Sequence, residues 1–370
     1  MNSSILGVIN LIHEADEMET LTASRCLATV PFGARFRLID FTLSSMVNSG
    51  IGKVGVFAQT KYRSLMDHLG SGKHWDLNHR QSGLFIMPPV TDDVNEVRRG
   101  DLYHFYQHRD YFSRSAQEYV LVTRSHMICN IDFEGVLASH KASGADITVI
   151  CKEQAELFGG RARKVKVDAR GRVTEMQDHF GRIQSDLISM EMYLMRKDLL
   201  LELVDTSLAQ GQDHLVRHAI MSRVDKLHIQ SYMFEGYLGV VNTLNSYYQN
   251  SMQLLKPDVW RSLFFEPGPI FTKVKDEPPA RYAEGAKTSN SLIANGCIIE
   301  GTVINSILFR GVHVRKGAVV RNSIVMQNGL IGENSSVDHV ILDKDVTIER
   351  GRELRGAEVS PFLAMKRKVI

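Results

Sequence analysis

The sequence predicts an α/β protein with a mostly parallel sheet, followed by a parallel β-helix. Over residues 1–255, short apolar runs alternate with helical patterns, which is typical of a parallel sheet covered by helices on both faces. Residues 289–370 instead repeat short motifs with a period of about 17 residues. A chain of 370 residues is long enough for two domains with separate cores.

The first domain is expected to contain five buried strands and four helices, apart from a hairpin. The strands are predicted from the apolar runs Ile5–Leu11, Val54–Ala58, Tyr119–Thr123, Ile147–Cys151 and Met192–Met195. The helices are predicted at Asp40–Asn48, Tyr62–Leu69, Leu102–Ser113 and Phe133–Ser143. The hairpin joins Val165–Val167 to Val173–Met176, because Asp168–Arg172 between them carries an Asp and a Gly that favour a tight turn.

A proline-rich segment follows the first domain. Pro257–Lys287 contains five prolines, and its apolar residues show no helical periodicity. We therefore expect residues 256–288 to form an ordered linker between the two domains.

The repeat defines the second domain. Asn290–Ile293, Asn305–Leu308 and Asn322–Val325 are near copies, and a second series places Gly or Asn at a fixed phase, as in Ile298–Gly301 and Val314–Gly317. Stacked coils bury the apolar residues, and Gly or Asn fits the corners that need positive φ. A short solenoid leaves an end exposed, so we expect an oligomerisation module.

Composition excludes several classes of function. A net charge of +2 gives no field for a polyanion, so nucleic acid is not expected as a partner. The four cysteines are scattered without a C-x-x-C pair, which favours a reducing cytosol over a disulfide or zinc framework. The N-terminal apolar run is too short to span a bilayer, and we expect a cytoplasmic protein without a membrane partner.

One motif resembles a known family. Residues 30–51 read VPFGARFRLIDFTLSSMVNSGI, which is similar to the segment after the phosphate-binding loop of the ADP-glucose pyrophosphorylase (glucose-1-phosphate adenylyltransferase) family. The resemblance covers essentially the whole chain, in order. It implies a Rossmann-like, GT-A-like nucleotidyltransferase domain and a left-handed β-helix.

The phosphate-binding loop itself is absent. The family has Gly-Gly-x-Gly-x-Arg-Leu where this chain has Leu11–Met18, a stretch without glycine or arginine that carries Glu14, Asp16 and Glu17. The family's reaction brings the phosphate of glucose 1-phosphate to the α-phosphorus of ATP, so its site needs positive charge. Three acids would repel a triphosphate.

At several positions where the family has residues that bind phosphate or metal, this chain has residues that cannot do so. Leu27 replaces a phosphate-facing lysine of the family, and Ser125 and Val240 replace its two metal-binding aspartates. His179 lies near the position of the lysine that holds the sugar phosphate. Losing one charged transition-state contact typically costs ~3–4 kcal/mol. We therefore expect no catalytic residue, no metal site and no productively bound cofactor here, with Mg²⁺ confined to a catalytic partner.

These losses resemble the non-catalytic, regulatory subunits of the family, the GlgD type. The resemblance implies a chain that is inactive or nearly inactive alone. It would pair with a catalytic homologue in a hetero-oligomer, expected to be a tetramer, and serve glycogen biosynthesis. Two alternatives stay open: a nucleotidyltransferase active alone with a rebuilt site, and a stand-alone sensor of sugar phosphate or nucleotide. Self-association of the isolated chain also stays open.

Four retained residues have two interpretations each. The resemblance implies that Arg25, Arg35 and Arg37 are candidates for an anion-binding effector site between the domains; the alternative is structural ion pairs. Gln59 matches a family loop linked to activation, or is a solvated loop end after a strand.

Overall fold

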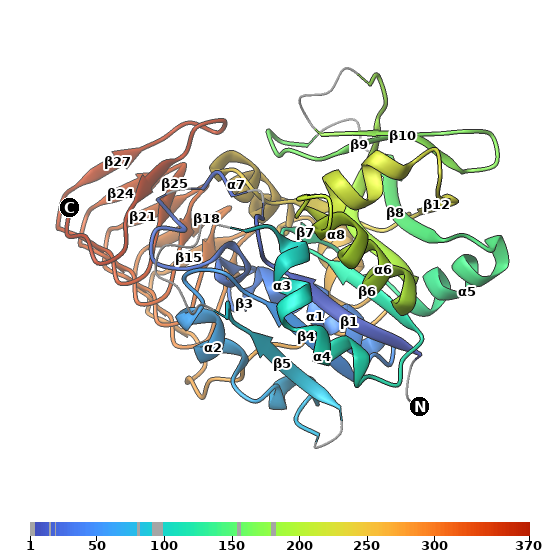
Figure 1. Ribbon diagram of the computed structural model, residues 1–370. Helices are drawn as coiled ribbons and strands as arrows, with labels where there is room; N and C mark the ends of the chain where they lie inside the picture. The colour runs from blue at the N-terminus through green and yellow to red at the C-terminus, as the bar shows by residue number, and fades with distance from the viewer. Residues whose placement is uncertain are drawn as a thin grey trace.

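A nine-stranded sheet forms the centre of the N-terminal domain in the computed structural model (Figure 1). The structure describes residues 4–14, 16–18, 20–79, 82–90, 99–153, 157–178 and 183–370. The sheet runs in the order β10-β9-β11-β6-β1-β4-β5, with β8 beside β11 and β12 beside β8. Its strands are β1 (Ile5–Asn10), β4 (Lys53–Phe57), β5 (Gly83–Met87), β6 (Tyr119–Thr123), β8 (Ile147–Glu153), β9 (Lys164–Val167), β10 (Val173–Gln177), β11 (Leu187–Arg196) and β12 (Ile229–Met233).

The sheet is parallel around β1 and becomes mixed beyond β6. Strand β1 pairs in parallel with β4 and β6, and Gly7 faces Val54 on one side and Leu121 on the other. Strand β11 is antiparallel to β6 and to β8, and β9 and β10 form the expected hairpin. The carboxyl ends of β1 and β6 therefore lie at the same edge, where parallel α/β sheets bind ligands.

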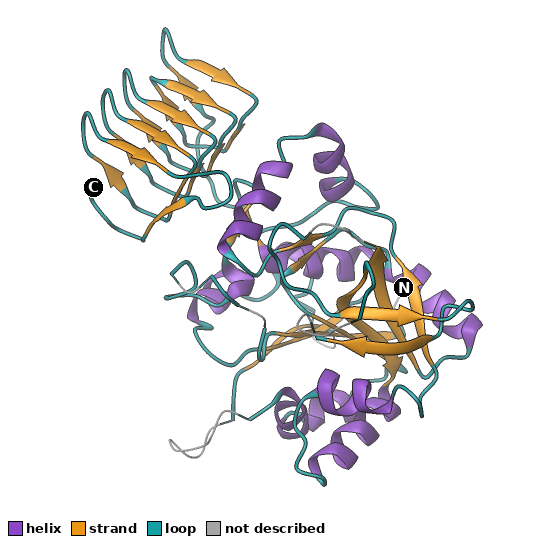
Figure 2. Ribbon diagram, turned by 90° about the horizontal axis from the view of Figure 1, so that it is seen from above, coloured by secondary structure: helices purple, strands orange, loops and turns teal. Residues whose placement is uncertain are grey.

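Helices cover both faces of this sheet (Figure 2). Alternate residues of β1 enter two separate cores: Ile5 and Ile9 pack in one, Leu6 and Val8 in the other. The first core takes side chains from α1, α2 and α5, and the second from α3, α4 and α6. The helices of this domain are α1 (Leu38–Asn48), α2 (Arg63–Leu69), α3 (Asp101–Gln107), α4 (Arg109–Ser113), α5 (Phe133–Ser143), α6 (Lys197–Leu208) and α7 (Leu244–Gln253).

Short elements complete the domain. Two small ladders pair β2 (Pro31–Phe32) with β3 (Phe36–Arg37), and β7 (Met127–Ile128) with β13 (Gly239–Val240). The helical turns are η1 (Leu27–Thr29), η2 (Lys73–Trp75), the π-helical η3 (Leu215–Ile220) and η4 (Met221–Arg223).

Two expectations differ from the structure. The helix expected over Leu102–Ser113 is broken at His108, whose ring nitrogen lies 2.8 Å from the Pro88 carbonyl oxygen. The expected linker is also partly regular, because α8 (Pro257–Phe264) begins it. Pro257 occupies the first turn, where a missing N–H costs nothing, and Val259 and Leu263 are buried four residues apart.

The C-terminal domain is a parallel β-helix of three five-stranded sheets, seen as a stack of coils in Figure 2. Its first strands, β14 and β15, precede residue 290. One sheet contains β14 (Arg281–Tyr282), β17 (Ile298–Ile299), β20 (His313–Val314), β23 (Leu330–Ile331) and β26 (Thr347–Ile348). The second contains β15 (Lys287–Ser289), β18 (Thr302–Ile304), β21 (Val319–Arg321), β24 (Ser336–Asp338) and β27 (Glu353–Arg355). The third contains β16 (Leu292–Ile293), β19 (Ile307–Leu308), β22 (Ile324–Val325), β25 (Val340–Leu342) and β28 (Phe362–Ala364).

The repeated asparagines form the corners of the β-helix. Asn290, Asn305 and Asn322 have φ of 43, 49 and 45°, a conformation that asparagine tolerates better than most residues. Their side chains form a ladder, since Asn290 Nδ2 donates to Asn305 Oδ1 at 2.8 Å and Asn305 Nδ2 to Asn322 Oδ1 at 2.7 Å. Within the described ranges, no helix is long and apolar enough to cross a membrane.

A shared apolar core holds the two domains together. Phe32 and Phe41 of the first domain and Tyr247 of α7 belong to the same buried cluster as Ile307 and Ile324 of the β-helix. This packing makes the junction between the domains a continuous part of the fold.

Candidate functional site

A cavity of about 420 Å³ opens beside the carboxyl ends of β1 and β6. His13 lies after β1, and Arg124 and His126 lie after β6. Asp101 from the start of α3 and His214 from just before η3 complete its rim. The cavity is thus at the position where the family resemblance places nucleotide and sugar.

Glu14 occupies the position expected for the metal site. The Ser125 backbone N–H and the Ser125 hydroxyl both donate to Glu14 Oε1, each at 2.7 Å. The Glu14 side chain is only 5% exposed, and its Oε1 lies 3.8 Å from His126 Nδ1. The loop after β1 therefore brings a buried carboxylate to the residue that stands for the first metal-binding aspartate.

Val240 lies beside the same place. In the β7–β13 ladder Val240 pairs with Met127, and the Val241 N–H donates to the His126 carbonyl oxygen at 2.9 Å. The two positions that the resemblance assigns to metal aspartates are thus brought together by the fold. Val240 is fully buried and offers no donor atom, so the residues present do not fit a Mg²⁺ ion. No group of three His, Cys, Asp or Glu side chains that could hold a metal occurs among the described residues.

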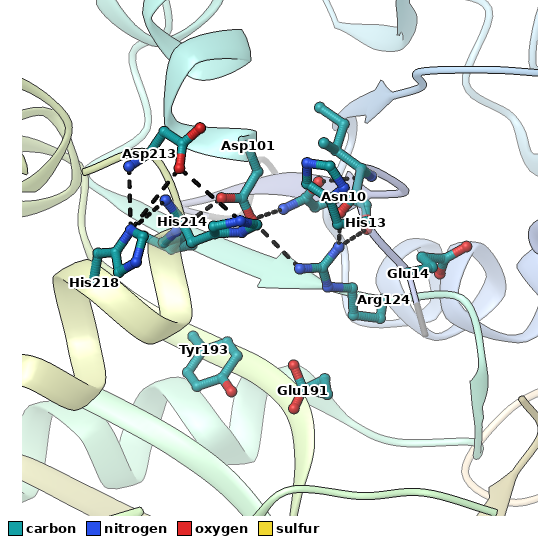
Figure 3. Close-up of polar contacts among 12 residues, drawn as sticks. Asn10, His13, Glu14, Asp101, Arg124, Glu191, Tyr193, Asp213, His214 and His218 are labelled. Atoms are coloured by element: carbon teal, nitrogen blue, oxygen red, sulfur yellow. Dashed lines mark hydrogen bonds and ion pairs between the residues drawn. The ribbon is translucent and has the colours of Figure 1, made fainter. Parts of the chain in front are cut away.

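Side chains also fix the loop that follows β1. The Arg124 guanidinium donates to the carbonyl oxygens of Asn10 and Ile12 and lies 3.4 Å from Asp101 Oδ2. Asn10 Nδ2 donates to the same Asp101 oxygen at 2.8 Å, and the Ile12 N–H donates to Asn10 Oδ1 at 3.1 Å. Carbonyl oxygens directed at the partly exposed Arg124 guanidinium replace the outward N–H groups that a phosphate loop needs (Figure 3).

An ion-pair network fills the far side of the cavity. Arg163 donates to Glu191 Oε1 at 2.5 Å and to Asp178 Oδ1 at 2.7 and 3.0 Å, and Arg217 donates to Asp178 Oδ2 at 2.8 Å. Burial alone would lower the pKa of Arg163, but Glu191 and Tyr193 outweigh it and the pKa is raised. His179, the residue expected near the lost lysine, lies outside the described residues, next to Asp178.

Glu191 has a backbone conformation that glycine adopts more readily than other residues. Its φ is 55°, and the pairing of β11 with β8 shifts register between Ser189 and Tyr193. A non-glycine residue at this φ carries some strain. The Glu191 side chain held on this backbone accepts the hydrogen bond from Arg163.

The cavity mouth carries a row of imidazoles that the sequence did not indicate. The ring centres of His13 and His214 are 5.0 Å apart, and those of His214 and His218 are 5.3 Å apart. Burial lowers the pKa of His214. His218 Nδ1 accepts the N–H groups of Asp213 and His214, which places its proton on Nε2 when neutral. The contact that brings His13 to His214 joins residues far apart in sequence, so local patterns do not reveal this group.

Two candidate effector residues lie together, and the third does not line the same cavity. Arg35 and Arg37 line a cavity of about 150 Å³ between the domains, with Lys273, Lys275 and Arg310 as further basic residues. Arg37 also donates to the Ser64 carbonyl oxygen at 2.9 Å. The lining is strongly basic and suits an anion.

Arg25 instead forms an ion pair between the domains. Its Nη2 lies 2.6 and 2.7 Å from the two carboxylate oxygens of Asp343, and the two side chains are 5% and 4% exposed. Burial, followed by Arg37 and Arg25, lowers the pKa of the neighbouring Lys344 to about 7. In the structure, Arg25 is therefore one half of a buried ion pair between the domains.

The remaining expected positions lie around a third cavity. Leu27 is buried in η1 within the core shared by the domains, so the position implied for a lysine carries a core residue. Gln59 follows β4 and lines a cavity of about 230 Å³ together with Glu14 and Arg25. Gln59 is thus close to the loop that holds Glu14.

Comparison with known proteins places both domains in known families. The model of the family described as nucleotidyl transferase matches residues 16–257, and that of the GlmU-like C-terminal hexapeptide family matches residues 278–358. The glycogen biosynthesis protein GlgD of Bacillus subtilis (strain 168) is 38% identical over 99% of this chain and 96% of its own length. GlgD of Geobacillus stearothermophilus is 44% identical over 86% of this chain and 84% of its own length. The glucose-1-phosphate adenylyltransferase of Thermosipho africanus (strain TCF52B) is 32% identical over 86% of this chain and 78% of its own length.

Proposed function

This chain belongs to the glucose-1-phosphate adenylyltransferase family, with GlgD glycogen biosynthesis proteins among its relatives, and on that premise we propose that it is a non-catalytic regulatory subunit. In this role it binds a catalytic homologue that makes ADP-glucose from ATP and glucose 1-phosphate. It raises or modulates the partner's activity and performs no turnover itself. Glycogen biosynthesis is the process that both subunits serve.

The Glu14 contact with Ser125 is the observation that carries this proposal. A buried carboxylate bonded at 2.7 Å to both donors of Ser125 puts a negative charge where Mg²⁺ and the triphosphate would have to rest. Val240 beside it supplies no carboxylate at the second metal position, so that position cannot help to hold a cation that would offset this charge. Both substrates are anions, so binding them together without a cation is unfavourable.

Regulation of a partner requires little energy. A ten-fold change in the partner's activity corresponds to about 1.4 kcal/mol of difference between two states of the complex. The junction of the domains offers a place for such control, because the basic cavity around Arg35 and Arg37 lies between the sheet domain and the β-helix. An anion bound there would contact both domains and bias how they present their surfaces to the partner.

Reconstitution with a catalytic homologue tests the proposal. Pyrophosphate release is measured for the purified chain alone, the catalytic homologue alone, and the two mixed, with ATP, glucose 1-phosphate and Mg²⁺. We expect no release from the chain alone and a changed rate for the mixture, with both chains in one peak on size exclusion. An unrelated protein added to the homologue at the same concentration is the control.

The same experiment separates the two alternatives. Turnover by the chain alone would favour an active enzyme with a rebuilt site. A mixture that neither co-elutes nor changes rate would reject the regulatory role, and the stand-alone sensor would then be the better interpretation.

A further inference from the structure

A groove runs between α8 and the first coil of the β-helix, on a part of the molecule not used by the proposed function. It is a cavity of about 870 Å³ whose lining includes Trp260, Phe265 and Leu292. A neighbouring cavity of about 730 Å³ shares these three residues but also contains the basic residues Arg35, Lys275 and Arg310, and it is not part of the groove. Volumes of this size are typical of binding sites for organic ligands. The groove is separate from the cavity beside β1 and β6, with which it shares no lining residue.

Two aromatic rings form a preformed platform in this groove. Phe265 is 63% exposed, and Trp260 is partly exposed. Trp260 packs on the buried Phe264 with ring centres 4.0 Å apart, which fixes the orientation of the indole. Exposed aromatic surface is unfavourable in water and marks sites that cover it with a ligand.

Polar groups with unused hydrogen-bonding capacity surround the platform. Arg261 and Glu266 have no ion-pair partner in the part of the chain that the structure describes, although both line the groove. Asn290 donates its amide to Asn305, which leaves its side-chain oxygen at the open end of the asparagine ladder and beside the groove. One cation, one anion and one amide therefore line the same wall.

We propose that this groove binds a neutral oligosaccharide. The apolar faces of sugar rings would cover Trp260 and Phe265, and sugar hydroxyls, which both donate and accept, would bond to Arg261, Glu266 and Asn290. A lipid chain would leave these polar groups unpaired, which is unfavourable once they are desolvated. A nucleic acid strand would meet a wall whose charges cancel, in contrast to the basic grooves that such strands need.

Tryptophan fluorescence gives a direct test, because the sequence contains only two tryptophans. Trp75 is 1% exposed, so Trp260 is the indole that a ligand can reach. The full-length protein is titrated with maltoheptaose and, separately, with cellohexaose at millimolar concentrations. We expect a saturable change in emission with at least one of the two, and the arm that responds identifies the linkage. The choice of an α-linked glucan as the first probe rests on the proposed function, whereas the neutral sugar class rests on the groove.

Variants locate the site. Phe265→Ala is expected to weaken the affinity, measured by calorimetry, by roughly ten-fold, which corresponds to about 1.4 kcal/mol. Phe362→Ala is the matched control, because Phe362 is 41% exposed on β28 and lies outside the groove. Its affinity should equal that of the wild type. Circular dichroism shows whether each variant is folded.

Three results would overturn the proposal. These are no binding of either oligosaccharide, equal affinity of Phe265→Ala and wild type, or a Trp260 response to the catalytic homologue without a response to sugars. The last result would make the groove a protein interface. Phe265→Ala should keep its effect on the catalytic homologue, so failure here is distinguishable from failure of the proposed regulatory role.

Discussion

Replacing Arg25 by methionine tests whether this arginine is a structural element or an anion ligand. In the structure Arg25 Nη2 lies 2.6 Å from Asp343 Oδ2, and both side chains are almost fully buried. Arg25→Met would leave the Asp343 carboxylate buried without its cation. Breaking a buried ion pair from one side typically costs about 3–5 kcal/mol.

Thermal unfolding followed by calorimetry measures this loss. For domains of this size about 1 kcal/mol shifts the melting temperature by roughly 2–4 °C, so the expected shift is roughly 6–20 °C downward. Because the pair joins the two domains, the transition should also broaden or split as their unfolding uncouples.

Two further variants make the measurement decisive. Arg25→Met with Asp343→Leu removes both charges and should recover most of the lost stability, since an apolar replacement of a buried pair is often neutral. Arg35→Met is the control, because Arg35 is exposed and lies over the Phe36 ring at 5.0 Å, an interaction of roughly 0.5–1 kcal/mol. If Arg25→Met is as stable as Arg35→Met and only its response to inorganic phosphate changes, Arg25 is a ligand and the reasoning is refuted.

Three other predictions follow from local geometry. The pKa of Lys344 is lowered by burial from 10.5 to about 7, so the unfolded chain binds more protons there between about pH 7 and 10.5 and stability rises with pH in that window. Lys344→Met should remove this rise in urea unfolding, and an unchanged slope would contradict it. Gly100→Ala should destabilise by about 1–3 kcal/mol, because its Cβ would overlap the Asp213 carbonyl oxygen; a melting temperature equal to wild type would count against this packing. Asn305→Ala should lose about 2–3 kcal/mol, since it removes two ladder bonds at a φ of 49°, and normal β-helix stability would show that the ladder is dispensable.

Elements with a clear period could be predicted from the sequence. Tyr119–Thr123 and Phe133–Ser143 have the expected bounds, because the first is a mostly apolar run that is buried throughout and the second ends at Gly144 in a left-handed conformation. The asparagine repeat correctly indicated the β-helix corners. Helix α8 was missed because the five prolines and the lack of helical periodicity over Pro257–Lys287 were interpreted as a linker, although proline is well tolerated in a first turn.

The site was predictable only in part. The acidic character of the loop after β1 is visible in the sequence, but the bond from Ser125 to Glu14 joins residues 111 apart. The ion pair of Arg25 with Asp343 joins residues 318 apart. Side-chain partners at such separations are set by the packing of the whole fold, and local patterns do not carry them.

Equilibrium binding of ATP to the isolated chain, with and without Mg²⁺, tests the central claim most directly. The Glu14 carboxylate and the aliphatic Val240 predict no saturable calorimetric signal from Mg²⁺–ATP in the cavity beside β1 and β6. Glu14→Gln is the informative companion, because it removes the charge while keeping an oxygen that can accept from Ser125. Mg²⁺-dependent binding by the wild-type chain, weakened rather than strengthened by Glu14→Gln, would show that Glu14 is a metal ligand and would contradict the account.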